Sequence, residues 1–248
     1  MIDQQFDLRD FIQVDSVATR ELGWPRPSPF NLKFSSRKLT DMQLEAISGS
    51  GLYMISKGDE VVYVGLYKPQ RGNIIADRWG RHLQTITGRG YNIGLGGKNP
   101  TARRDALLAA VAAPRLREAI EHAYLYSQAS RYKDTGYNTT PNRLRFASEN
   151  WDNFGQDDSE QVLRPLTFWL LRTRVADSQE TAARDVKAIE TRVLQDFKPA
   201  CNKEYKHDLH EGRRKDNTVE ALTEAIRQAA HAVTNADVRD RIQLSLCS

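Results

Sequence analysis

The sequence has few cysteines and no long hydrophobic run. Cys201 and Cys247 are the two cysteines in 248 residues, which fits a reducing compartment, and neither belongs to a cluster that could hold a metal. No apolar run approaches the roughly 18 residues of a membrane-spanning helix. Residues 1–5 show neither the basic head nor the apolar stretch of a signal peptide. Motifs for a serine or cysteine nucleophile and internal repeats are also missing. We therefore expect a cytoplasmic protein without a membrane partner.

The basic residues are concentrated in two stretches of the chain. The net charge is +4, but eight basic residues stand against one acidic residue between positions 66 and 104, and six stand against three between 198 and 215. A charge surplus often forms only a solvated face. The alternative for the first surplus, which directly follows a predicted hairpin, is a phosphate-binding surface. The apolar fraction of 40% and the charged fraction of 27% are those of a soluble globular protein.

Two tyrosines, each separated from a glycine by one residue, mark a predicted β-hairpin. The strings Gly51-Leu52-Tyr53 and Tyr63-Val64-Gly65 enclose apolar residues and a turn segment, Lys57-Gly58-Asp59-Glu60. Apolar runs on both sides of a Gly-Asp turn predict two antiparallel strands. Tyrosine is common in strands, so the hairpin alone is a weak functional signal.

Two predicted helices carry the remaining polar residues of interest. Over 74–86, Arg78 and His82 are four residues apart, so they share one face of a helix. Over 180–197, Glu190 lies inside the apolar stripe of a helix, where a carboxylate needs a partner or a metal. Pro199 ends this helix, and Asn202 follows it.

Together these residues resemble the GIY-YIG nuclease family, over about residues 50–98 and 164–205. Leu52 and Val64 replace the two isoleucines of the family pattern, and its polar positions are matched by Tyr53, Tyr63, Arg78, His82, Glu190 and Asn202. The resemblance implies an α/β (α+β) fold: a small, mostly antiparallel three-stranded sheet flanked by helices. An N-terminal extension, a helical insertion and a C-terminal helix would surround this core.

The resemblance also implies how these residues hydrolyse a phosphodiester bond. Glu190 would hold one Mg²⁺ in each active site, which Mn²⁺ can replace. Arg78 would contact a phosphate oxygen, and either Tyr63 or Tyr53 would act as the general base. His82 would orient the active tyrosine or take its proton. Asn202 would anchor its loop or the waters of the metal.

Outside the resemblance, the chain divides into three further parts. Residues 1–49 form a proline-stiffened extension, an insertion for DNA recognition at about 99–163 interrupts the nuclease domain at 50–205, and a helical tail occupies 206–248. Asn, Arg and Tyr side chains in the insertion can read base edges. The expected DNA contacts are Lys68, Arg71, Arg81, Arg89, Lys98, Arg103, Arg104, Arg143 and Arg145.

The compact arrangement, with a large insertion inside the core, is similar to that of the family's restriction enzymes. We expect a metal-dependent type II restriction endonuclease of a restriction-modification system, which cuts a palindromic site in double-stranded DNA as a homodimer. One alternative is a mobile-element or modification-dependent defence nuclease of the same family. Another is a DNA-binding protein that does not cut.

The hairpin register gives a test of this reading. A two-residue loop at Gly58-Asp59 would pair Tyr53 with Val64 and place the two tyrosines on opposite faces of the sheet. Local turn preferences favour that loop. The active site needs both tyrosines on one face, so the resemblance predicts an odd-numbered loop or a compensating bulge. Both hydroxyls should then point toward Arg78, His82 and Glu190.

Overall fold

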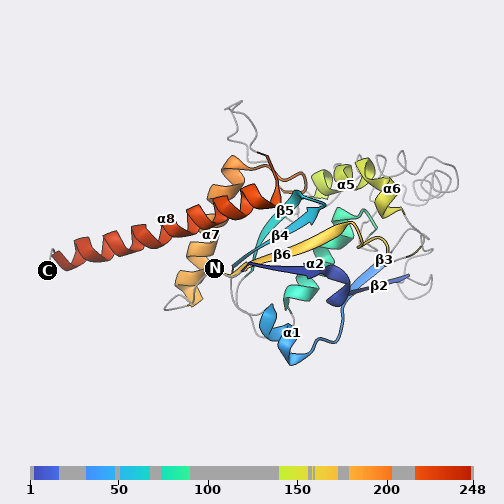
Figure 1. Cartoon of the computed structure of the whole chain (residues 1–248), viewed down its shortest axis with the longest axis horizontal. Helices are drawn as coiled ribbons and strands as arrows, with labels where there is room; N and C mark the ends of the chain where they lie inside the picture. The colour runs from blue at the N-terminus through green and yellow to red at the C-terminus, as the bar shows by residue number, and fades with distance from the viewer. Residues whose placement is uncertain are drawn as a thin grey trace, which may run out of the picture.

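The central feature of the fold is a four-stranded antiparallel sheet. The computed structural model describes residues 3–16, 32–47, 51–67, 74–89, 140–155, 158, 160–172, 179–202 and 216–246. The sheet has the order β1-β6-β4-β5, and each neighbouring pair is antiparallel. Its strands are β1 (Asp3–Asp7), β4 (Gly51–Lys57), β5 (Glu60–Tyr67) and β6 (Leu166–Arg172) (Figure 1). The mixed α/β architecture with an antiparallel sheet agrees with the sequence-based prediction.

The N-terminal extension supplies the fourth strand, which the sequence did not predict. β1 pairs with β6, and Phe6 is its one large apolar residue. A short polar edge strand of this kind is held by its backbone hydrogen bonds and leaves little trace in the apolar pattern. The helix η1 (Leu8–Asp10), a second sheet of β2 (Ile12–Ser16) and β3 (Leu32–Ser36), and helix α1 (Asp41–Ala46) complete this region.

The hairpin combines a two-residue turn with a bulge. Lys57 pairs with Glu60, and Gly58 at the turn has a φ of 60°, a conformation that suits glycine. The register then shifts, so that Ile55 pairs with Tyr63 while Ser56 pairs with Val61. Val62 is left without a partner in this ladder. The predicted compensating bulge is confirmed, and it places Tyr53 and Tyr63 on the same face of the sheet.

The face with the tyrosines packs against helix α2 (Ile74–Ile86) and the N-terminal elements. Tyr53, Tyr63, Trp79 and Leu83 belong to one apolar cluster. The predicted helix over 74–86 is confirmed. Helices α5 (Thr140–Glu149) and α6 (Trp151–Phe154) contribute Phe146, Ala147, Trp151 and Phe154 to the same cluster. Residues 99–139 of the predicted insertion lie outside the described residues.

The opposite face is covered by the two last helices, α7 (Gln179–Asp196) and α8 (Val219–Leu246). Val186, Ile189 and Val193 of α7 join Leu52 and Met54 of β4 in a second apolar cluster. The sequence predicted both helices, α7 over 180–197 and α8 as the helix of the tail at 206–248. Figure 1 shows the C-terminal part of α8 reaching well beyond the sheet. No helix in the described part of the chain is long and apolar enough to cross a membrane.

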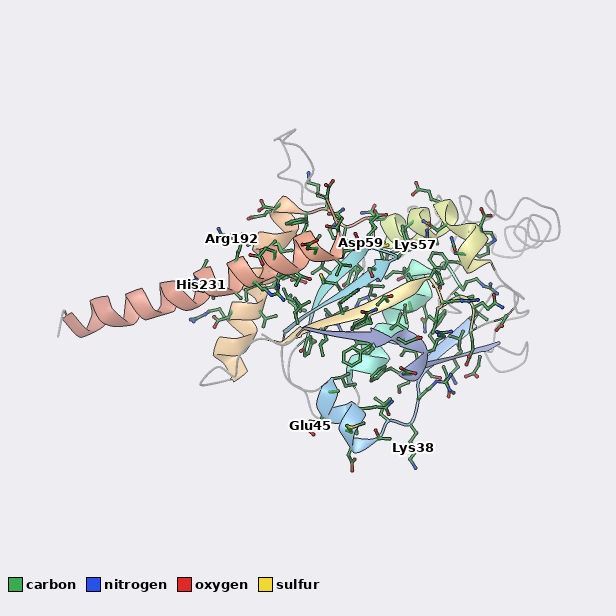
Figure 2. All side chains as sticks on the ribbon, viewed as in Figure 1. Lys38, Glu45, Lys57, Asp59, Arg192 and His231 are labelled. Atoms are coloured by element: carbon green, nitrogen blue, oxygen red, sulfur yellow. The ribbon has the colours of Figure 1, made fainter. Side chains whose placement is uncertain are left out.

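The outer edge of β5 is covered by the segments that adjoin α7 and α8. The backbone N–H of Cys201 donates to the carbonyl of Val62 at 2.8 Å, and the N–H of Val61 donates to the carbonyl of Asn217 at 2.6 Å. At the turn, the N–H of Val219 donates to the carbonyl of Asp59 at 3.0 Å. Figure 2 labels Asp59 and Lys57 at this turn, close to the beginning of α8. The carbonyl of the bulge residue is thus satisfied from outside the hairpin.

Gly65 provides a test of how closely the Tyr53 ring packs on its own hairpin. A Cβ atom at position 65 would lie 2.5 Å from Cζ of Tyr53 and 2.6 Å from its hydroxyl oxygen. We expect Gly65→Ala to lower the free energy of unfolding by about 1–3 kcal/mol, because overpacking forces the ring to move. Urea denaturation measures this. In a Tyr53→Val background the same substitution should cost little, and an equal cost in both backgrounds would show that the ring is not the obstacle.

Candidate active site

The two hairpin tyrosines form the centre of the candidate site. Their ring centres are 5.8 Å apart, and both side chains lie on the face of the sheet that α2 covers. Tyr53 is fully buried and stacks on Phe168, with ring centres 5.2 Å apart and planes 15° from parallel. Tyr63 is 7% exposed, so it lies closer to the surface. The pair therefore has an inner and an outer member.

Helix α2 brings His82 and Arg78 to the tyrosines. The His82 ring centre is 4.8 Å from that of Tyr63 and 6.1 Å from that of Tyr53. Arg78, one helical turn earlier, is exposed, and its positive charge acts on Tyr53. The buried residues Trp79, Leu83 and Ile86 fix the helix against the sheet. Four of the six predicted polar residues are thus grouped on one face of the sheet: Tyr53, Tyr63, His82 and the exposed Arg78.

The environment of Tyr53 favours its neutral form. Burial raises the pKa of the Tyr53 hydroxyl well above its usual value, and the neighbouring Tyr63 raises it further. The positive charges of Arg78 and Arg143 act in the opposite direction without cancelling the rise. Tyr53 therefore keeps its proton at neutral pH, so it is suited to donating a hydrogen bond rather than accepting a proton.

Asn202 anchors its segment to the bulged strand. Its Oδ1 accepts a hydrogen bond from the N–H of Val64 at 2.8 Å, and its Nδ2 donates to the carbonyl of Val64 at 2.7 Å. The carbonyl of Asn202 in turn accepts a hydrogen bond from Nδ2 of Asn142 at 2.8 Å. Both polar atoms of the Asn202 side chain are used on Val64. Of the two roles expected for it, anchoring the loop is the one that this geometry matches.

Glu190 is buried, as its place in the apolar stripe predicted, but it lies with the helices on the other side of the sheet. It is 8% exposed and flanked on α7 by Ile189 and Val193 of the second apolar cluster. Its Oε2 accepts a hydrogen bond from Nζ of Lys187 at 2.6 Å. This ion pair is its one polar contact within the described residues. The structure brings Glu190 into no such contact with Tyr53, Tyr63, Arg78 or His82.

The donors for a metal are correspondingly few. Among the described residues, no group of three His, Cys, Asp or Glu side chains is close enough together to hold an ion. Glu190 is a single buried carboxylate, and Lys187 occupies one of its oxygens. This set fits Mg²⁺ only if a single carboxylate binds the ion and water and substrate oxygens fill the other coordination positions. An ion bound there would compete with the ammonium group of Lys187.

Two of the arginines expected to contact DNA are instead buried in the protein. Nη1 of Arg89 donates to the carbonyl of Phe154 at 2.9 Å, and the Arg89 guanidinium lies 5.8 Å from the Trp151 ring centre. Arg143 lies over the ring of Tyr63, 4.7 Å from its centre. Neither has the surface position expected from the sequence. Five expected contacts and the side chains of two others lie outside the described residues: Lys68, Arg71, Lys98, Arg103 and Arg104, and Arg81 and Arg145.

The burial of Arg143 was not predicted, although the insertion carries a helical pattern that indicates it. Arg143 lies on α5 at positions i, i+3 and i+4 with Phe146 and Ala147, and all three are buried. It is thus a charged residue within a buried stripe, the same signal that singled out Glu190. Cys201 is also buried near the site, and burial raises the pKa of its thiol, which removes it as a nucleophile.

The anchoring role of Asn202 can be measured as stability. Asn202→Ala leaves the buried N–H and carbonyl of Val64 without their partners, so we expect the free energy of unfolding to fall by about 2 kcal/mol or more. Asn142→Ala is the matched control, because it removes one hydrogen bond from a half-buried site and should cost about 1 kcal/mol. Chemical denaturation compares them. Equal small losses would mean that Asn202 does not hold this segment.

The raised pKa of Tyr53 predicts a loss of stability at alkaline pH. In the unfolded chain the hydroxyl titrates near its ordinary value of about 10, while the folded protein retains the proton. The stabilisation is therefore complete below about pH 10 and decreases as the pH rises above it, by up to about 1.4 kcal/mol per pH unit. Urea denaturation of the parent and Tyr53→Phe between pH 7 and pH 11 tests this. The parent should lose more stability above pH 10, and parallel curves would contradict the prediction.

Comparisons of the chain with protein-family models, with curated proteins and with solved structures each give no match. The resemblance to a nuclease family therefore rests on the residues and geometry of this chain itself.

Proposed function

We propose that this protein is an endonuclease that hydrolyses phosphodiester bonds of DNA, with the active site of a GIY-YIG nuclease. The observation that supports this most directly is the bulge that places Tyr53 and Tyr63 on one face, beside His82. A local two-residue turn alone would have separated them. The grouping of two phenols, an imidazole and an exposed arginine is suited to proton transfer next to a phosphate.

The chemistry divides among these residues according to their surroundings. Arg78 is exposed and can bind a phosphate oxygen and balance the charge that develops on it during hydrolysis. Tyr53 keeps its proton, so it orients water or phosphate as a hydrogen-bond donor. Tyr63 is then the tyrosine that takes the proton of the attacking water, and it does so as its own phenol proton passes to a neighbouring group. His82, whose ring is in contact with that of Tyr63, is placed to receive the proton or to orient the phenol.

The resemblance implies a divalent cation at Glu190, which would polarise the phosphate and steady the leaving oxygen. Because α7 packs on the face of the sheet opposite the tyrosines, this role requires that the bound phosphate lies within reach of both groups. The burial of Glu190 on α7 holds its carboxylate in a defined orientation. Lys187 supplies its countercharge without the ion. The site as described has one matched carboxylate, so we propose one ion in each active site rather than two.

The specific form we propose is a type II restriction endonuclease that acts as a homodimer on a palindromic site in double-stranded DNA. A dimer with two-fold symmetry places equivalent groups on the two half-sites of a palindrome. The insertion within the core, whose described part includes α5 and α6, supports this form. A defence or mobile-element nuclease with looser or modification-dependent specificity has the same chemistry and differs in the choice of site.

A non-catalytic DNA-binding protein is the second candidate, and one observation favours it. Glu190 is engaged by Lys187 and has no contact with the tyrosine group in the described residues. A protein that only binds DNA needs no ion at Glu190 and could use this pair for stability alone.

Supercoiled plasmid DNA with and without Mg²⁺ separates the two candidates. The parent should nick or linearise the plasmid only with the metal, and the cut ends should map to one sequence. Glu190→Gln should bind DNA but lower the cleavage rate by at least about a hundredfold, because it removes the carboxylate that would hold the ion.

Glu224→Gln is the matched control, since Glu224 is an exposed glutamate on the neighbouring helix α8, and it should cut like the parent. Binding without any cutting by the parent would establish the non-catalytic candidate. Full cutting by Glu190→Gln would place the metal elsewhere.

A further inference from the structure

Arg143 is a buried cation next to the candidate base, and its described contacts are all with uncharged groups. It is 5% exposed, although a guanidinium stays charged at all ordinary pH values. Its described partners are the Tyr63 ring, the carbonyl of Cys201 and the hydroxyl of Thr85. A methionine of similar length could fill this volume without burying a charge. Packing alone therefore does not account for an arginine at this position.

The contacts of Arg143 join three elements that carry the candidate site. Its Nε donates to the carbonyl of Cys201 at 3.3 Å, directly before Asn202. Its Nη1 donates to Oγ1 of Thr85 at 3.0 Å. The guanidinium carbon lies 4.7 Å from the centre of the Tyr63 ring on β5. One side chain thus connects the segment after α7, helix α2 and the bulged strand.

The contact with Thr85 leads back to His82. Oγ1 of Thr85 donates its hydrogen to the carbonyl of His82 at 2.9 Å while it accepts from Arg143. Arg143 is therefore linked to both residues that the proposed reaction needs side by side. It reaches the backbone of His82 through the Thr85 hydroxyl, and it contacts the ring of Tyr63 directly.

We propose that Arg143 is a positioning residue for Tyr63, which holds the phenol ring against His82 in the orientation needed for proton transfer. A cation over the face of an aromatic ring is attracted by the ring's electrons, and its planar fork fixes the position of the cation itself. Arg143 comes from α5, outside the residues that resemble the nuclease pattern. The inference rests on the proposed function for its effect on rate, but the contact with Tyr63 is independent of that function.

The first experiment is steady-state cleavage kinetics. Arg143→Met should lower kcat about a hundredfold, since a small displacement of a catalytic group can cost that much, and leave KM unchanged. Arg143→Lys should recover part of the rate, because it keeps a cation over the ring. Arg37→Met is the matched control. Arg37 also makes two hydrogen bonds, to the Arg9 carbonyl and to Glu160, and it has no contact with the tyrosines.

A double-mutant cycle shows whether Arg143 acts through Tyr63. In a Tyr63→Phe background, Arg143→Met should lower kcat far less than it does in the parent, because the proton acceptor is already absent. The same fold-loss of kcat in both backgrounds would overturn the proposal. So would a loss that appears wholly in KM, since that would make Arg143 a DNA-binding residue.

A second cycle needs no activity and separates this inference from the proposed function. Urea unfolding of Arg143→Met, Tyr63→Leu and the double variant should show losses that are less than additive, because each single variant removes the same contact. If the parent does not cut DNA, the proposed function fails, while this cycle still decides whether Arg143 holds Tyr63. Additive losses would overturn the inference. If Arg143→Met does not fold, Arg143→Gln, which also removes the cation from the ring, takes its place in both cycles.

Discussion

The bulge at Val62 is the constraint on which the rest of the site depends. It reverses the parity that the two-residue turn at Gly58-Asp59 would impose, and so it moves Tyr63 to the face of Tyr53. A bulge leaves backbone groups without ladder partners, and here the carbonyl of Val62 accepts from the N–H of Cys201. Two residues after Val62, the backbone of Val64 is hydrogen-bonded to both the oxygen and the nitrogen of the Asn202 side chain. The conformation of the hairpin is therefore stabilised from a segment about 140 residues farther along the chain.

The same segment also links the hairpin to α5. Cys201 donates its N–H to the bulge and offers its carbonyl to Arg143, and Arg143 lies over Tyr63. These contacts form a closed ring that returns to the strand where it began. Substitution of any one of these residues should destabilise the contacts of the others, because a buried polar group that loses its partner lowers the free energy of unfolding. The geometry of the site therefore depends jointly on three segments that are distant in sequence: β5, the segment of Cys201, and α5.

The sequence predicted the parts of this structure that have strong local periodicity. Trp79, Leu83 and Ile86 have helical spacing and are buried, in agreement with the predicted helix over 74–86. The apolar stripe around Glu190 predicted both α7 and the burial of the carboxylate. The ion pair of Glu190 with Lys187 lies within one helical turn and could also have been predicted. β1 could not, because its strand is polar and is held by backbone pairing with β6. The contact of Arg143 with Tyr63 depends on the tertiary packing of α5, which no local pattern contains.

The covered edge of β5 has a consequence for how this protein meets other chains. An exposed edge strand can add a strand from another molecule, which is a common route to aggregation and also a common way to bind extended peptides. Along β5, backbone or side-chain groups of Asn217, Cys201 and Asn202 already occupy positions at Val61, Val62 and Val64. Strand addition there would first have to break these hydrogen bonds. The site-bearing edge of the sheet is thus protected against polymerisation by the same residues that set the register of its tyrosines.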